Sequence, residues 1–133
     1  MFKYVRTINA CSGIVETINI PAPADQTENA ICKVGTICCI VDGVLSNTRS
    51  TCGAKYLVLS APNSKGEQCC LRIMPGMILK AESYFPTNEC KIGDGVSFTA
   101  VEGGGIDCVD MGGSDCEIID KKESGGLLTV VVL

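Results

Sequence analysis

Ten cysteines are the residues of this sequence best suited to chemistry, as metal ligands, redox centres or nucleophiles. Structural zinc sites use C-x-x-C spacing because it brings two thiolates to one ion, and no two cysteines here have that spacing. The adjacent pairs Cys38 and Cys39, and Cys69 and Cys70, lie in strand-like runs. Neighbouring side chains of a strand point to opposite faces, so neither pair can share one ion. The spacing therefore predicts no metal site.

The state of these thiols depends on the compartment. The first twenty residues contain no apolar segment of signal-peptide length, so we expect a reducing compartment. Cysteines then serve as small buried apolar side chains. A disulfide framework is the alternative, because ten cysteines among 133 residues also fit a small secreted domain.

Histidine is absent from the sequence, which removes the most common general base and the most common metal ligand. A nucleophilic cysteine or serine normally needs such a partner. The sequence also contains neither a C-x-x-C redox motif nor a G-x-S-x-G motif. We therefore expect no enzymatic activity, no catalytic residue and no cofactor.

Two glycine-rich segments carry carboxylates. Gly93, Asp94 and Gly95 precede a strand-like run rather than a helix, so they predict a turn instead of a phosphate-binding loop. Four more carboxylates lie near a pair of glycines: Asp107, Asp110, Asp115 and Glu117. They could surround a divalent cation, but solvated turn carboxylates are the interpretation that we favour.

Short strands are the elements that would position these residues. With 46% hydrophobic and 20% charged residues, the chain can bury a core. Runs rich in β-branched residues alternate with turn signals such as Asp42 and Gly43. The run 77–84 fits a helix or a strand by pattern alone. The apolar run 127–133 predicts a strand that is buried in a sheet or covered by a partner.

These patterns predict an all-β fold, a small β-barrel or β-sandwich with an extended N-terminal arm. Pro21 and Pro23 interrupt the strand pattern, because proline cannot donate to a strand ladder. We therefore expect an arm at residues 1–30, suited to binding a partner, and a barrel or sandwich domain at residues 31–133. A net charge of −4 argues against nucleic acid as a partner. No run approaches the roughly 20 apolar residues of a membrane span, so a membrane is not expected either.

The second half of the chain resembles the head decoration proteins, or capsid cement proteins, of tailed bacteriophages. The resemblance covers about residues 55–133 and rests on turn-plus-strand segments. These segments are LRIMPGMILKA at 71–81, KIGDGVSF at 91–98, GIDCV at 105–109, EIID at 117–120 and GLLTVVV at 126–132.

The resemblance implies a small β protein that binds the outer surface of an icosahedral capsid and stabilises it without catalysis. It also implies the major capsid protein as partner, self-association with a trimer favoured, and a location on the virion capsid after assembly in the host cytoplasm. By this resemblance the N-terminal arm would contact the capsid as an added strand. The residues expected at that contact are Tyr4, Val5, Ile8, Ile14, Val15, Ile18 and Ile20.

Other functions remain open from the sequence. A secreted, disulfide-stabilised β domain for adhesion or binding would leave few free thiols. A carrier-type barrel would need a modified lysine at a hairpin tip, and Lys65 lacks the expected flanking residues. Other structural roles in a phage particle would fit the same composition.

Overall fold

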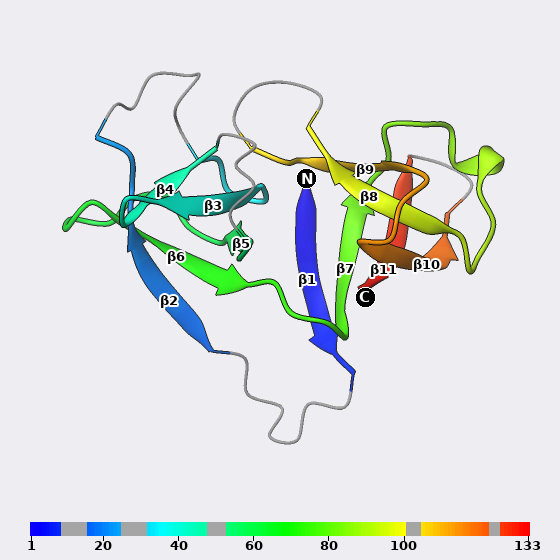
Figure 1. Ribbon diagram of the computed structural model, residues 1–133, viewed down its shortest axis with the longest axis horizontal. Coiled ribbons are helices and arrows are strands. Elements are labelled where there is room, and N and C mark those ends of the chain that lie inside the picture. Colours follow the sequence, from blue (N-terminus) through cyan, green and yellow to red (C-terminus); the bar gives the residue numbers. More distant parts are fainter. Residues whose placement is uncertain (9–15, 25–31, 48–52, 101–104, 123–125) are drawn as a thin grey trace. The chain divides into compact units, whose positions relative to one another are not determined.

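The computed structural model describes residues 1–8, 16–24, 32–47, 53–100, 105–122 and 126–133 (Figure 1). Of these residues, 54% lie in strands and 3% in a helix. The prediction of an all-β fold is therefore confirmed. The helix that the described residues contain is the short 3-10 helix η1 (Thr87–Glu89), and no described helix is long and apolar enough to cross a membrane.

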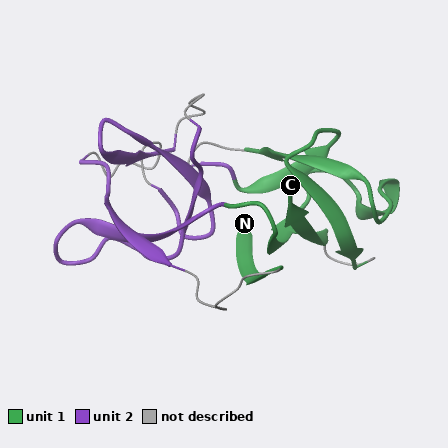
Figure 2. Cartoon of the chain, turned by 60° about the horizontal axis from the view of Figure 1, so that its bottom comes forward, with its two compact units in different colours: residues 1–14, 74–101, 107–133 green, residues 15–73, 102–106 purple. Residues whose placement is uncertain are grey.

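The chain forms two compact units (Figure 2). The first unit comprises residues 1–14, 74–101 and 107–133, and the second comprises residues 15–73 and 102–106. The segment expected as an arm, residues 1–30, contributes to both units. Strand β1 (Phe2–Thr7) is hydrogen-bonded into a sheet of the first unit, and β2 (Thr17–Pro21) into a sheet of the second.

The first unit contains a six-stranded antiparallel sheet in the order β1-β7-β11-β10-β8-β9. Its later strands are β7 (Met77–Glu82), β8 (Gly95–Thr99), β9 (Cys108–Met111), β10 (Cys116–Lys121) and β11 (Leu127–Val132). Strand β11 lies between β7 and β10, and its alternate side chains Leu128, Val130 and Val132 are buried. The expectation that this apolar run is buried inside a sheet is confirmed. The ambiguous run that begins at Met77 is a strand.

This sheet curls so that its two edges approach each other. The rings of Phe2 on β1 and Phe98 on β8 meet edge-to-face, with centroids 5.4 Å apart. A parallel bridge joins Ser83, just after β7, to Val109 on β9, and the Tyr84 backbone N–H donates to the Val109 carbonyl at 2.9 Å. The described strands do not close into a barrel. Curling encloses one face of the sheet as the core of this unit.

The second unit contains a five-stranded antiparallel sheet in the order β2-β6-β5-β3-β4. Its remaining strands are β3 (Ile37–Val41), β4 (Val44–Ser46), β5 (Tyr56–Val58) and β6 (Glu67–Arg72). Asp42 and Gly43 join β3 to β4 with φ values of 52° and 78°. Two successive positive φ values define the tight hairpin turn that the sequence predicts at this dipeptide.

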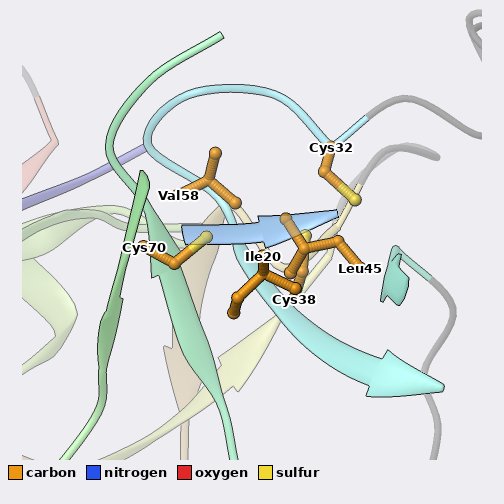
Figure 3. Packing of buried hydrophobic residues seen from close by; sticks show 6 residues of the cluster. All are labelled: Ile20, Cys32, Cys38, Leu45, Val58 and Cys70. Carbon is orange, nitrogen blue, oxygen red and sulfur yellow. The ribbon is translucent and has the colours of Figure 1, made fainter. Parts of the chain in front are cut away.

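Cysteines fill much of the core of the second unit (Figure 3). The buried cluster consists of Ile20, Cys32, Cys38, Leu45, Val58 and Cys70. These residues come from all five strands and from the segment that precedes β3. Thiols of this size pack as small apolar groups, as the sequence predicts.

Candidate functional site

Strand β1 places three of the residues expected to bind a partner. It forms one edge of the six-stranded sheet, and its pairing with β7 shifts register between Tyr4 and Arg6. Val5 lies in this bulge and is 43% exposed, while Ile8, just after the strand, is 39% exposed. Tyr4 is half-buried, and its hydroxyl lies 2.7 Å from that of Thr7. Val5 and Ile8 therefore offer apolar surface beside an edge strand.

Strand β2 contains two residues that the sequence predicts at the partner contact, and their burial is opposite. Ile18 is 49% exposed, whereas Ile20 is 2% exposed and belongs to the cysteine-rich core. Residues two apart on a strand face the same side, so alternation alone would predict equal burial for Ile18 and Ile20. Their burial differs because Ile20 packs in the cluster with Leu45 and Val58, whereas Ile18 lies outside that cluster. Ile14 and Val15 lie outside the described residues.

Buried thiols lie close together in the core of the second unit. Cys32 and Cys38 are 1% and 2% exposed, and their thiols are hydrogen-bonded to each other. The Thr36 hydroxyl oxygen lies 3.6 Å from the Cys38 sulfur. These hydrogen bonds lower the pKa of the Cys38 thiol, and the bond to Cys38 raises the pKa of Cys32. Cys38 is therefore the more acidic thiol of the pair.

The other thiols are weakly acidic. Burial, followed by the charge of Cys38, raises the pKa of Cys70 to about 12. Burial and the neighbouring Asp107 carboxylate raise the pKa of Cys108 to about 11. Both thiols are therefore protonated at neutral pH, which makes them poor nucleophiles and poor metal ligands. The described residues contain no group of three or more cysteine, aspartate or glutamate side chains placed to hold a metal ion.

No disulfide joins the cysteines in the part of the chain that the structure describes. The described residues contain eight cysteines: Cys32, Cys38, Cys39, Cys69, Cys70, Cys90, Cys108 and Cys116. Cys11 and Cys52 lie outside the described residues.

Gln68 anchors the thiol cluster from β6. Its side chain is 1% exposed, and its Nε2 donates to the carbonyl oxygens of Cys32 at 2.8 Å and Ser60 at 3.0 Å. Its Oε1 has no hydrogen-bond partner among the residues that the structure describes. The sequence pattern did not predict that Gln68 is buried, because a polar residue in a strand of alternating pattern is expected to face solvent.

A hollow of about 690 Å³ lies beside η1 in the first unit. It is lined by Pro86, Thr87, Asn88, Lys121 and Gly126. The Lys121 ammonium donates to the Cys90 carbonyl at 2.6 Å and the Thr87 carbonyl at 3.5 Å. These bonds hold the lysine against the backbone, so its role here is to stabilise the turn after η1.

Three carboxylates of the two glycine-rich segments accept backbone N–H groups. Asp94 accepts the backbone N–H of Lys91 at 2.8 Å, and Asp115 accepts that of Phe98 at 2.9 Å. Asp110 accepts the N–H of the next residue at 2.8 Å. The prediction of a turn at Gly93, Asp94 and Gly95 is confirmed.

Comparison of the chain with known protein families, curated proteins and solved structures gives no match. The function must therefore be argued from the residues and geometry above.

Proposed function

We propose that this protein is a structural component of a tailed-bacteriophage head, which binds the outer surface of the capsid and stabilises it without catalysis. The observation that carries the proposal is the position of β1 at the edge of its sheet, with Val5 and Ile8 exposed beside it. The resemblance of residues 55–133 to capsid decoration proteins supports the same function.

An edge strand suits attachment to a shell. Its outward backbone N–H and C=O groups can pair with an extended segment of a partner, and exposed side chains beside it add specificity. The bulge at Val5 shifts the register of β1 against β7, which directs that side chain outward. Many copies bound to one shell would convert a modest affinity at each site into lasting attachment.

The polar groups of the first unit support a non-catalytic role. Lys121 donates to the Cys90 carbonyl, and Asp94 and Asp115 accept the backbone N–H groups of Lys91 and Phe98. The Cys108 thiol has a raised pKa, so it is protonated at neutral pH. These groups stabilise the fold, and the proposal needs nothing further from them.

The proposal is tested first by mass spectrometry of purified virions of the phage that encodes the chain. We expect the chain among the head proteins, in a fixed ratio to the major capsid protein. Heads stripped of the chain should then bind the purified protein again in a co-sedimentation assay. Absence of the chain from the virions would refute the proposal.

Substitutions in β1 connect this binding to the proposed surface. Val5→Asp together with Ile8→Asp should weaken rebinding by about tenfold or more, because each places a charge in an apolar contact. Ile92→Asp is the matched control, since Ile92 is also exposed and lies in a turn of the same unit. Equal loss in both variants would place the contact elsewhere.

A further inference from the structure

Two thiols in the core of the second unit are in direct contact. Cys32 and Cys38 belong to the same buried cluster (Figure 3), and their side chains are hydrogen-bonded to each other. Cys32 precedes β3, and Cys38 is the second residue of that strand. No disulfide joins them. Two thiols in contact need little movement to form a covalent bond.

A tight turn between the two cysteines brings them together. The Thr36 N–H donates to the Lys33 carbonyl at 3.2 Å, and Gly35 has a φ of 86°. A positive φ at the third residue of a four-residue turn is typical of a type II turn and favours glycine there. The chain therefore reverses directly after Cys32, which places this residue beside the start of β3.

Hydrogen bonds to β5 and β6 hold this turn in place. The Gly35 N–H donates to the Val58 carbonyl at 2.8 Å, and the Val58 N–H donates to the Thr36 carbonyl at 3.0 Å. Gln68 Nε2 donates to the Cys32 carbonyl at 2.8 Å. The folded chain thus holds one thiol beside the other, which gives their reaction the advantage of an intramolecular step.

We propose that Cys32 and Cys38 form a disulfide when the protein meets a peroxide, and that this bond stabilises the second unit. The Cys38 thiolate attacks one oxygen of hydrogen peroxide, the O–O bond breaks, and a sulfenic acid and one water result. The Cys32 sulfur then attacks the sulfenic sulfur, and the S–O bond breaks to release a second water. The two sulfur atoms lose two electrons to the peroxide, and the two thiol protons end in the two waters.

The surroundings of the pair assign the first step to Cys38. Hydrogen bonds from Cys32 and Thr36 stabilise the Cys38 thiolate and lower the pKa of that thiol. The hydrogen bond to Cys38, followed by burial, raises the pKa of Cys32. The thiolate is the nucleophilic form, so Cys38 reacts with the oxidant and Cys32 resolves the sulfenic acid. Oxidation removes the negative charge of Cys38 and with it part of the effect on Cys32.

The other described thiols of the second unit are less well placed. Cys70 belongs to the buried cluster, but its thiol donates to the Gln68 carbonyl at 3.5 Å. Cys39 and Cys69 are each next to a member of the cluster on the same strand, so their side chains point to the opposite face of the sheet. The hydrogen-bonded pair is therefore the one that we expect to react.

The test is incubation of the purified full chain with hydrogen peroxide, then alkylation in urea without reductant and digestion with trypsin. The incubation must be long, because both thiols are buried and react as the core opens locally. Trypsin cleaves after Lys33, so a disulfide between Cys32 and Cys38 would join peptides 7–33 and 34–49. Fragment ions then assign each sulfur, since each peptide contains a second cysteine.

Oxidation should also raise the urea unfolding midpoint by about 1 M, because a bond that closes the loop 32–38 restricts the unfolded chain. Cys32→Ala keeps a small apolar side chain and should abolish both the joined peptides and the rise in midpoint. Cys69→Ala is the matched control, since Cys69 is a half-buried thiol of the same unit, and it should keep both. Cys38→Ala repeats the test from the other side of the bond, should Cys32→Ala fail to fold.

Recovery of the two peptides unjoined after oxidation would overturn the proposal, as would a disulfide to Cys70 or to another cysteine in place of this one. A midpoint that does not rise when the peptides are joined would overturn the stabilising role. A rise that persists in Cys32→Ala would assign it to a different oxidation and would also overturn that role. None of these outcomes depends on capsid binding, so the proposed function is tested separately.

Discussion

Gly105 offers a sharp test of how the second unit is packed. It has a φ of +111°, and a Cβ atom at this position would lie 3.0 Å from the Cβ of Thr36 and 3.1 Å from the sulfur of Cys38. Gly105→Ala therefore combines an unfavourable backbone conformation with a steric clash beside the thiol cluster. Its neighbour Ile106 bridges to Ile37 on β3, which restricts how far the backbone can move away.

The two effects can be estimated separately. Holding a side chain in a rarely populated backbone conformation costs about 1–3 kcal/mol, and overpacking a core costs about 1–3 kcal/mol. We therefore expect Gly105→Ala to reduce the free energy of unfolding by about 2–6 kcal/mol. With a urea m-value of about 2 kcal/mol/M, the unfolding midpoint falls by about 1 M or more.

Substitutions at two other glycines distinguish the cost of the backbone conformation from the cost of the steric clash. Gly43 has a φ of +78° but nothing within 4 Å of a built Cβ, so Gly43→Ala should cost about 1–2 kcal/mol from strain alone. Gly53 has neither a positive φ nor a near neighbour, so Gly53→Ala should change stability by less than about 0.5 kcal/mol. If Gly105→Ala costs no more than Gly43→Ala, the close approach of Gly105 to Thr36 and Cys38 is wrong.

Three further predictions follow from the burial and hydrogen bonds. Ile20→Ala should reduce the free energy of unfolding by about 2–5 kcal/mol because Ile20 is 2% exposed. Ile18→Ala, at 49% exposure, should change it by less than about 0.5 kcal/mol, and equal effects in urea unfolding would contradict this difference in burial. Burial raises the pKa of Cys70 from 9.0 to about 12, so between these pH values the unfolded chain releases a proton that the folded chain keeps. Stability should therefore fall as pH rises above about 9, and Cys70→Ala should reduce the slope of urea midpoint against pH; an unchanged slope would argue against a buried thiol. Asn63→Ala should cost about 1 kcal/mol in the same assay, because Asn63 Oδ1 accepts the N–H groups of Lys65 at 2.9 Å and Glu67 at 3.0 Å, while Asn88→Ala is expected to be nearly neutral.

Local patterns were sufficient to predict several elements. The dipeptide of Asp42 and Gly43 predicts its hairpin because few residues adopt two successive positive φ values. Alternation in the run from Val96 predicts β8, and the apolar run from Leu127 predicts a strand inside a sheet. Each of these features depends on neighbours in the sequence, so a single sequence contains the information.

The partner-binding residues were harder to predict. Ile18 and Ile20 look equivalent in the sequence, yet one is exposed and the other is in the core. Their difference depends on which strands surround β2, and that pairing joins residues about fifty positions apart, such as Ile18 and Cys70. Gln68 was missed for the same reason, because its partners Cys32 and Ser60 come from other segments.

The sequence by itself determined the all-β class, most of the turns and the role of cysteine as a small core residue. These properties follow from backbone preferences and from the composition of short segments. The tertiary structure alone decided that the N-terminal strands belong to two different units. It also decided that Lys3, Lys80 and Thr129 are cross-strand neighbours on β1, β7 and β11. Strand order and register arise from long-range pairing, where many combinations satisfy the same local pattern and only the packed core selects among them.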